Sequence, residues 1–271
     1  MLLRISFFTL ALFCFSDRAL AFGREGHEVI AGLAFTMLSE DSHKALSSLM
    51  GTQYRLEWVG SSYWAAEQTE KAGNEWMQNL HEVLFDTDAQ TFSPTADCPD
   101  NKCVVAAILE SEKVLKERAK FTLVQQRQAV KYLLHYVADI HQPTNCGFKR
   151  DEGGRKILLT SGDTQVNLHW VWDSGIMQLA GKKWSTLAGE LSKQITPEKI
   201  SSWTADMDPQ KWAWECHQAA RDVAYKTAMD NKEWGLSYYK AVWPTYQEQL
   251  EKAAVRLAYL LNDLFKEKMN Q

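Results

Sequence analysis

The sequence predicts an all-α fold, a single multi-helix domain with one short β-hairpin. Apolar residues recur every three or four positions in four stretches, at 29–38, 104–115, 129–140 and 250–265. This spacing gathers them on one face of a helix. Long runs of β-branched residues are absent, and no repeat, low-complexity segment or linker divides the sequence. A chain of 271 residues is compatible with one domain that buries a large core.

The N-terminus resembles a secretory signal peptide. Arg4 precedes an apolar run at 5–15 that is too short to span a bilayer, and Ala19-Leu20-Ala21 supplies small residues for signal-peptidase cleavage. The sequence therefore predicts a signal peptide at 1–21 and a mature domain at 22–271. It also predicts a secreted or periplasmic protein with no stable membrane anchor.

The charge balance excludes one class of nucleic-acid-binding protein. The chain carries 30 basic and 34 acidic residues, for a net charge of −4. Proteins that hold duplex nucleic acid by surface charge are strongly basic. Any polyanion must therefore be bound locally, for example through metal ions.

Four cysteines follow the predicted cleavage site, and an even number in an exported protein favours two disulfides. The most economical pairing joins Cys98 to Cys103 across a tight loop and Cys146 to Cys216 over a long range, although four cysteines allow three pairings. Zinc binding by cysteines is the alternative. The spacing of Cys98 and Cys103 is too wide, and its surroundings too acidic, to favour it.

One strand-like segment interrupts the helical pattern. Residues 156–160 lie between Gly153-Gly154 and the turn-forming sequence Ser161-Gly162-Asp163. Turn residues on both sides of a short apolar run are typical of a hairpin. We therefore expect the short β-hairpin here.

Two histidine–aspartate pairs have the spacing of metal ligands on a helix. His135 and Asp139 form the first pair, and His169 and Asp173 form the second. Positions i and i+4 share a helix face, so an imidazole and a carboxylate can converge on one cation. Pro143 disfavours helix at the residue before it, so the chain after Asp139 must turn and can fold back over the first pair.

Two more histidines and the new N-terminus complete the candidate ligands. His27 lies five residues after Phe22, whose free α-amino group can lose its proton and bind a metal together with the first carbonyl. His81 ends the run Trp76-Met77-Gln78-Asn79-Leu80. Nitrogen and carboxylate ligands without thiolates suit a hydrolytic zinc site. Taken alone, each histidine is better explained as an ordinary core or surface residue; their occurrence together favours the zinc site.

Three motifs spread over the chain agree with one known family. They are Phe22-Gly23-x-x-Gly26-His27, His135-x-x-x-Asp139-x-x-Gln142-Pro143 and Asn167-Leu168-His169-x-x-Trp172-Asp173. With these motifs the chain resembles the zinc-dependent single-strand-specific nucleases and 3′-nucleotidases, which share a superfamily with the zinc phospholipases C. Shorter agreements extend the resemblance over the whole mature chain: Trp64-Ala65, His81, Gly153-Gly154, Trp212-Ala213-x-Glu215 and Ala224-Tyr225.

The resemblance implies an α-helical fold with three zinc ions in a cleft. Carried over position by position, it divides the ligands into three groups: Phe22 with His27, His81 with His135, and His169 with Asp173, Asp139 being shared by the first two groups.

Two departures concern the ligands and the catalytic carboxylate. The family's remaining ligand of the third zinc is a histidine, and the matching residue here is Asn145, with His141 as a possible substitute. The family's aspartate after Trp-Ala is Ala66. Glu67 follows one residue later; it either takes over the role of orienting the attacking water or is an exposed helix carboxylate.

Two further departures concern the substrate. Thr69 stands where the family has an arginine, and Arg155, where it usually has Asn, is either a phosphate clamp or a solvated loop charge. The family's base-binding aromatic is Glu82. Other aromatic residues that could stack on a base are each more often core: Phe85, Phe148 and Trp170.

The implied activity is hydrolysis of single-stranded DNA, RNA and 3′-nucleotides by a zinc-activated hydroxide, with Asp139 and Glu67 as catalytic residues. A zinc phospholipase C that acts on phospholipid is the alternative enzyme. A degraded homologue that binds metal without turnover is the third hypothesis, prompted by Ala66 and Asn145.

Overall fold

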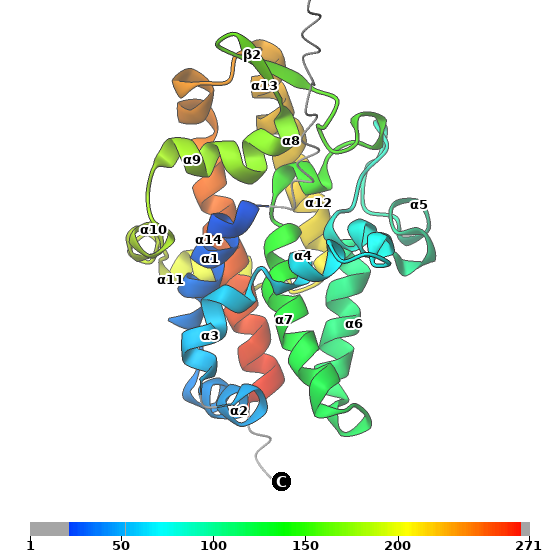
Figure 1. The fold of residues 1–271 in the computed structure, drawn as a ribbon, viewed down its shortest axis with the longest axis vertical. Helices are drawn as coiled ribbons and strands as arrows, with labels where there is room; N and C mark the ends of the chain where they lie inside the picture. The colour runs from blue at the N-terminus through cyan, green and yellow to red at the C-terminus, as the bar shows by residue number, and fades with distance from the viewer. Residues whose placement is uncertain (1–21, 52, 267–271) are drawn as a thin grey trace, which may run out of the picture.

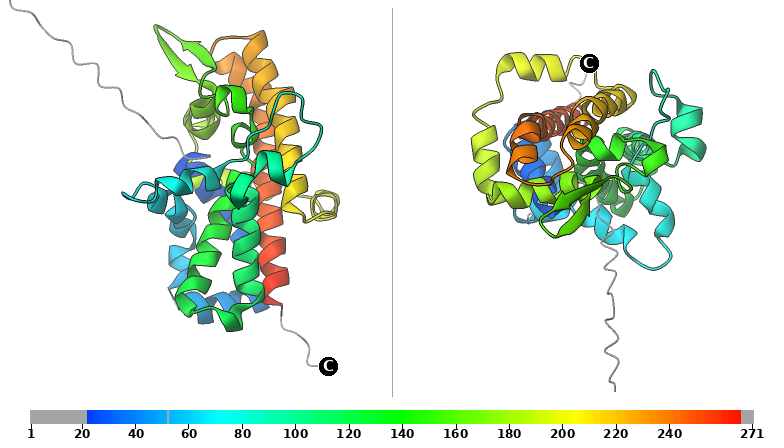
Figure 2. Two further views of the ribbon diagram at one scale, coloured as in Figure 1. Left: turned by 90° about the vertical axis from the view of Figure 1, so that its right-hand side faces the viewer. Right: turned by 90° about the horizontal axis from the view of Figure 1, so that it is seen from above.

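Long helices form the centre of the computed structural model, which describes residues 22–51 and 53–266. Helices α1, α7 and α14 lie side by side along the long axis, and α6 packs against α7 (Figures 1 and 2). The predicted helices are confirmed in α1 (Gly23–Phe35), α6 (Val104–Lys116), α7 (Leu123–Asp139) and α14 (Leu236–Phe265).

Shorter helices surround this centre. The α-helices are α2 (Glu40–Met50), α3 (Tyr54–Ser61), α4 (Trp64–Thr69), α5 (Pro94–Asp97), α8 (Leu168–Trp170), α9 (Ile176–Ala180), α10 (Trp184–Leu191), α11 (Pro197–Trp203), α12 (Pro209–Ala219) and α13 (Lys226–Asp230). The 3₁₀ turns are η1 (Glu75–His81), η2 (Pro99–Asn101), η3 (Arg118–Lys120), η4 (Pro143–Cys146) and η5 (Lys149–Asp151). Two π-helical turns, η6 (Val171–Gly175) and η7 (Ala220–Tyr225), continue α8 into α9 and α12 into α13.

The predicted hairpin is confirmed at the upper end of the molecule (Figure 1). Strand β1 (Leu158–Ser161) pairs antiparallel with β2 (Thr164–Asn167), and Gly162 takes the positive φ of 59° that the tight turn requires. Backbone hydrogen bonds from Thr160 to residues 232 and 234 attach the hairpin to the loop after α13.

Helix α7 carries the first histidine–aspartate pair, and its ends are set by local sequence. Thr122 and Gln125 form a capping box at its N-terminus, where each side chain satisfies a free backbone N–H of the other residue. The helix ends at Asp139, because Gln142 before Pro143 is extended (ψ 112°) and η4 turns back. The last turns of α7 are buried, so both His135 and Asp139 lie inside the molecule.

The cysteines behave differently in the two predicted pairs. Cys98 and Cys103 form the predicted disulfide. The structure does not form the second predicted bridge, since Cys146 and Cys216 are free and buried. The two thiols are in contact with each other as free cysteines. Cys146 also donates to the Ile140 carbonyl oxygen (3.5 Å), and Cys216 to the Gln142 carbonyl oxygen (3.3 Å).

Two predictions concern export and membrane attachment. The predicted signal peptide, 1–21, lies outside the described residues. Among the described helices, none combines the length and the apolar character that crossing a membrane requires.

Candidate metal centre

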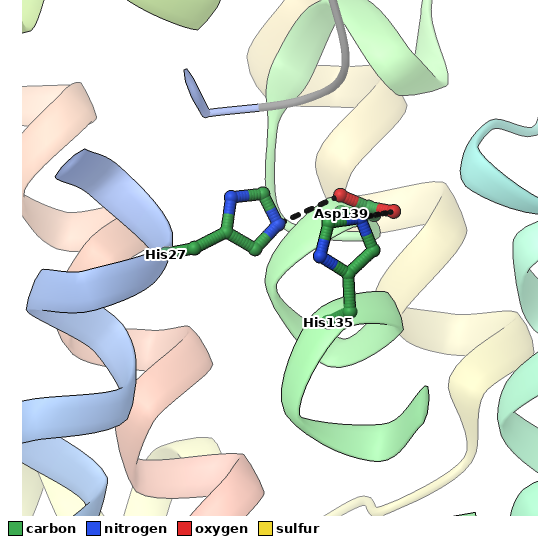
Figure 3. A group of neighbouring side chains, drawn as sticks. All are labelled: His27, His135 and Asp139. Carbon is green, nitrogen blue, oxygen red and sulfur yellow. Dashed lines mark hydrogen bonds and ion pairs between the residues drawn. The ribbon is translucent and has the colours of Figure 1, made fainter. Parts of the chain in front are cut away.

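A buried carboxylate at the end of α7 is the focus of the candidate centre (Figure 3). His27 reaches it from α1, with its Nε2 3.1 Å from Asp139 Oδ1. His135 lies one turn earlier on α7, with its Nε2 3.3 Å from Asp139 Oδ2. All three side chains are fully buried, and their ligand atoms are close enough to share one metal ion.

His81, at the end of η1, joins the same carboxylate from a third direction. Its Nδ1 lies 2.7 Å from Asp139 Oδ2 and 3.1 Å from His135 Nε2. One carboxylate oxygen therefore faces His27, and the other faces His81 and His135. This division is what a carboxylate shared by two cations requires. We call these four residues the Asp139 cluster.

The second nitrogen of each imidazole is fixed by a hydrogen bond. Nδ1 of His27 donates to the Gly23 carbonyl oxygen (2.8 Å), and Nδ1 of His135 donates to the Ser62 carbonyl oxygen (2.7 Å). These acceptors carry no proton, so the proton must be on Nδ1. Nε2, which faces Asp139, is then left with a lone pair in the neutral ring.

Thr69 orients the third imidazole. Its hydroxyl donates to the Ala65 carbonyl oxygen (3.2 Å) and so accepts from His81 Nε2 (2.8 Å). His81 therefore points the lone pair of Nδ1 at Asp139. Three lone pairs around one buried carboxylate call for a cation, and an orienting hydrogen bond on the second nitrogen is typical of metal-ligating histidines.

Electrostatics in the cluster favours the ligand forms of these groups. Burial lowers the pKa of His135 well below its ordinary value, and the neighbouring His27 and His81 oppose a positive charge there as well. Burial by itself raises the pKa of Asp139, whereas positive charge at His135 and His81, from protons or from a bound cation, lowers it well below its usual range. A neutral imidazole beside an ionised carboxylate is the state that binds a metal ion.

The second histidine–aspartate pair lies in α8 and η6. His169 Nε2 is 3.2 Å from Asp173 Oδ2, and His169 Nδ1 donates to the Gly153 carbonyl oxygen (2.8 Å). Gln142, just after the end of α7, donates from Nε2 to Asp173 Oδ1. Asp173 Oδ2 is buried and accepts no hydrogen bond from the described residues.

The start of α1 lies against this second pair. Gly23 has a φ of +52°, and a Cβ atom there would lie 2.8 Å from the Asp173 carbonyl oxygen. Only glycine fits such an approach without strain. Because α1 also carries His27, the Asp139 cluster and the second pair are neighbours.

Arg155, predicted as a phosphate clamp, lies at the second pair. Its NH2 donates to His169 Nε2 (3.1 Å), and its NH1 donates to Glu82 Oε2 (2.7 Å). About a third of its side chain is exposed. The structure therefore brings Arg155 to the candidate ligands, and it pairs Glu82 with the arginine.

Other predicted residues make contacts with residues outside the ligand set or with backbone atoms. Glu67 is half exposed and forms an ion pair with Arg24 (2.9 Å), and its catalytic role stays a prediction. Nε2 of His141 accepts from Arg256 NH1 (3.0 Å), which excludes it as a substitute ligand here. Asn145 donates from Nδ2 to the Asp139 carbonyl oxygen (3.1 Å).

Phe22 and two of the aromatic candidates, Phe85 and Phe148, are buried in the molecule, whereas Trp170 is partly buried. Phe22 is buried, its carbonyl oxygen accepts from the Gly26 N–H (3.1 Å), and its ring meets Tyr246 edge-on; its role as a ligand stays a prediction. Phe85 and Phe148 are buried against His217 and belong to the core.

Sequence reasoning missed Tyr63 and Arg24. The Tyr63 ring contacts the imidazoles of His27 (centroids 5.7 Å apart) and His135 (5.9 Å), and the Arg24 guanidinium lies 4.5 Å over it. Burial raises the pKa of Tyr63 to about 12, so the phenol is neutral. Arg24 lies within the first family motif, and Tyr63 directly precedes Trp64-Ala65. Their positions in the sequence could therefore have indicated that they lie near the site.

The fold and the cluster together define a class: helical proteins with a buried histidine–carboxylate centre suited to a metal ion. Within that class the chain belongs to the S1/P1 nuclease family, whose family model matches residues 22–266. The predicted family is thereby confirmed.

Curated relatives cover nearly the whole chain. Endonuclease 2 of Arabidopsis thaliana is 29% identical over 267 residues, which cover 90% of each chain. Nuclease S1 of Aspergillus oryzae is 25% identical, with 96% of each chain covered. Nuclease P1 of Penicillium citrinum is 24% identical over 89% of this chain and 97% of its own length.

Proposed function

We propose that the protein is a zinc-dependent nuclease that hydrolyses phosphoesters of single-stranded nucleic acids and of 3′-nucleotides. The observation that carries the proposal is the Asp139 carboxylate, whose two oxygens face different histidines. Membership of the S1/P1 nuclease family and the names of the relatives, endonucleases and nucleases, support it.

The donor set of the Asp139 cluster fits zinc. It offers three imidazole nitrogens and one carboxylate, and each imidazole is oriented by a hydrogen bond on its other nitrogen. Phe22, His27 and Asp139 would hold one ion, and His81, His135 and Asp139 would hold another. When bound, zinc supplies Lewis-acid stabilisation of negative charge on a phosphate group.

The surrounding residues prepare the site for a phosphoester. Arg24, beside Tyr63, and Arg155, beside His169, flank the cluster with partly exposed guanidinium groups. Guanidinium donors match phosphate oxygens in geometry and charge. They allow a protein of net charge −4 to bind a polyanion at one place.

Burial of the cluster supports a preference for single strands. His27, His135 and Asp139 have no exposed surface. A phosphate group of a regular duplex is fixed on the surface of a wide, stiff double helix, which cannot enter a recessed centre. A single strand can turn its bases out and bring the phosphate in.

Export is part of the proposal. The predicted signal peptide at 1–21 and the disulfide between Cys98 and Cys103 support a secreted or periplasmic protein, because disulfides persist in oxidising compartments.

The test uses the chain that begins at Phe22. It is incubated with single-stranded DNA, duplex DNA, 3′-AMP and phosphatidylcholine vesicles, with and without a chelator, and zinc is then added back. We expect products from single-stranded DNA and 3′-AMP that disappear with chelator and return with zinc. Products from the vesicles alone would indicate a phospholipase, and no chelator-sensitive product at all would indicate a binding protein.

A matched pair of variants tests the residues. His135→Ala removes a ligand from the cluster and should abolish the products. His43→Ala removes a histidine of α2 whose ring bonds to the Tyr54 hydroxyl, at the opposite end of the molecule from the hairpin (Figure 1), and should leave activity unchanged.

A further inference from the structure

We propose that the Arg155 guanidinium takes the place of a metal ion at His169 and Asp173, so that metal ions bind at the Asp139 cluster and not at the second pair. The inference rests on the proposed function and deepens it. The fixed charge of the arginine then acts on the same substrate phosphate as the metal-binding cluster beside it.

The argument begins with the single lone pair of His169. Nδ1 of His169 carries a proton, because it donates to the Gly153 carbonyl oxygen (2.8 Å). Nε2 therefore has the ring's only lone pair, and it accepts from Arg155 NH2 at 3.1 Å. A zinc ion would need the same lone pair, at about 2.0–2.1 Å from Nε2. The ion and the guanidinium cannot both use it.

Arg155 is held in this position from the other side. Its NH1 donates to Glu82 Oε2 (2.7 Å) and to the Glu152 carbonyl oxygen (2.9 Å). The loop that carries it is anchored by Asp151, which accepts from the Gly154 N–H (2.7 Å) and from the Tyr225 hydroxyl (2.6 Å). The arginine is thus part of a fixed arrangement and not a loose surface charge.

The second pair also lacks ligands for a metal ion. Gln142 occupies Asp173 Oδ1, and Asn145 directs its amide nitrogen at the Asp139 carbonyl oxygen. While Arg155 holds His169 Nε2, Asp173 Oδ2 is the one ligand atom of the pair left, which is fewer than the three or four protein ligands that zinc sites have. With Arg155 in place, the residues at this pair therefore do not fit a third zinc ion.

The pair still requires positive charge. Asp173 Oδ2 is buried, lies 3.2 Å from His169 Nε2, the nitrogen that accepts from Arg155, and has no hydrogen-bond donor among the described residues. Such a group is costly without a nearby cation. Arg155 brings a cation to the imidazole, and its part-exposed guanidinium keeps donors free for a phosphate oxygen.

The Asp139 cluster shows the opposite arrangement. Within residues 22–51 and 53–266, no arginine or lysine donates a hydrogen bond to His27, His81 or His135. Their ligand nitrogens stay available for metal ions.

The test follows the imidazole signals of His169 by NMR in histidine-labelled protein that begins at Phe22, while zinc is added beyond the amount retained after dialysis. In the wild-type protein we expect the His169 signals to stay unshifted. In Arg155→Asn, where His169 Nε2 is no longer held by the guanidinium, they should shift as zinc is added. Arg150→Asn, on the same loop with its guanidinium over the Phe148 ring, should behave as wild type.

The outcomes separate the two proposals. Zinc-dependent shifts of His169 in the wild-type protein would overturn the replacement of the metal ion by Arg155, even if nuclease activity is present; this result needs no variant to fold. Unshifted His169 signals in Arg155→Asn would overturn it as well. The expected shifts in a protein with no nuclease activity would support the replacement and overturn the proposed function.

Discussion

The Asp139 cluster and the His169–Asp173 pair share a sequence pattern but differ in the residues that surround them. Each has a histidine and an aspartate four residues apart, and in each the histidine donates from Nδ1 to a backbone carbonyl oxygen. Asp139, however, meets two more imidazoles, whereas Asp173 meets an amide and its histidine meets Arg155. The i, i+4 spacing brings each histidine close to its aspartate. Residues from distant parts of the chain determine whether a metal ion or an arginine lies beside the pair.

The largest expected difference between the two groups is in metal retention. Asp139→Asn should lower zinc affinity by well over about a hundredfold and abolish activity, because even the loss of a residue that only orients a ligand costs about 10–100-fold. Asp173→Asn should leave zinc content unchanged. Competition with a chromophoric chelator measures both. Equal losses in the two variants would show that the second pair holds metal after all.

The next effect concerns the hydrogen bond that orients His81. Thr69→Val removes the hydroxyl that accepts from His81 Nε2, and we expect a fall of about 10–100-fold in zinc affinity. Thr204→Val is the matched control, since Thr204 also donates to a carbonyl four residues earlier but is exposed. Chelator competition that gives the same affinity for both variants would refute the role of Thr69.

A pH effect should follow from the buried His135. The unfolded chain gains a proton near the ordinary pKa of 6.5, whereas the folded chain resists it because burial lowers the pKa of His135. Below about pH 6.5 protons therefore favour unfolding, and stability of the metal-free protein should fall by up to about 1.4 kcal/mol per pH unit. Urea denaturation at several pH values measures how the free energy of unfolding changes with pH. This dependence should be weaker in His135→Gln than in the wild-type protein. An equal dependence in both would show that His135 is not its source.

The smallest effect is expected for Glu67, the predicted catalytic carboxylate. It is half exposed and paired with Arg24, and exposed ion pairs contribute about 0–1 kcal/mol. Glu67→Gln should change kcat by less than about threefold on single-stranded DNA. A loss of a hundredfold or more would mean that the carboxylate turns into the cluster during the reaction.

Much of the fold could be predicted because it follows from local patterns. Apolar spacing of three and four residues predicts α1, α6, α7 and α14, and turn residues on both sides of a short apolar run predict the hairpin. The i, i+4 pairs were recognisable for the same reason, since helix geometry fixes their approach.

Contacts between distant segments could not be predicted in the same way. Arg155 meets Glu82 across 73 positions, and Glu67 meets Arg24 across 43. In each case the partner depends on side-chain direction after packing, which sequence spacing does not contain.

Helix α1 carries His27 and, through Gly23, also contacts the backbone of Asp173. The backbone of α1 meets the Asp173 carbonyl oxygen where even one methyl group would be too close, while His27, one turn later, points to Asp139. The first turn of α1 therefore acts as a spacer that fixes the distance between the Asp139 cluster and the His169–Asp173 pair. A larger residue at position 23 would push α1 away from Asp173, so the distance between the two groups depends on the absence of a side chain at this position.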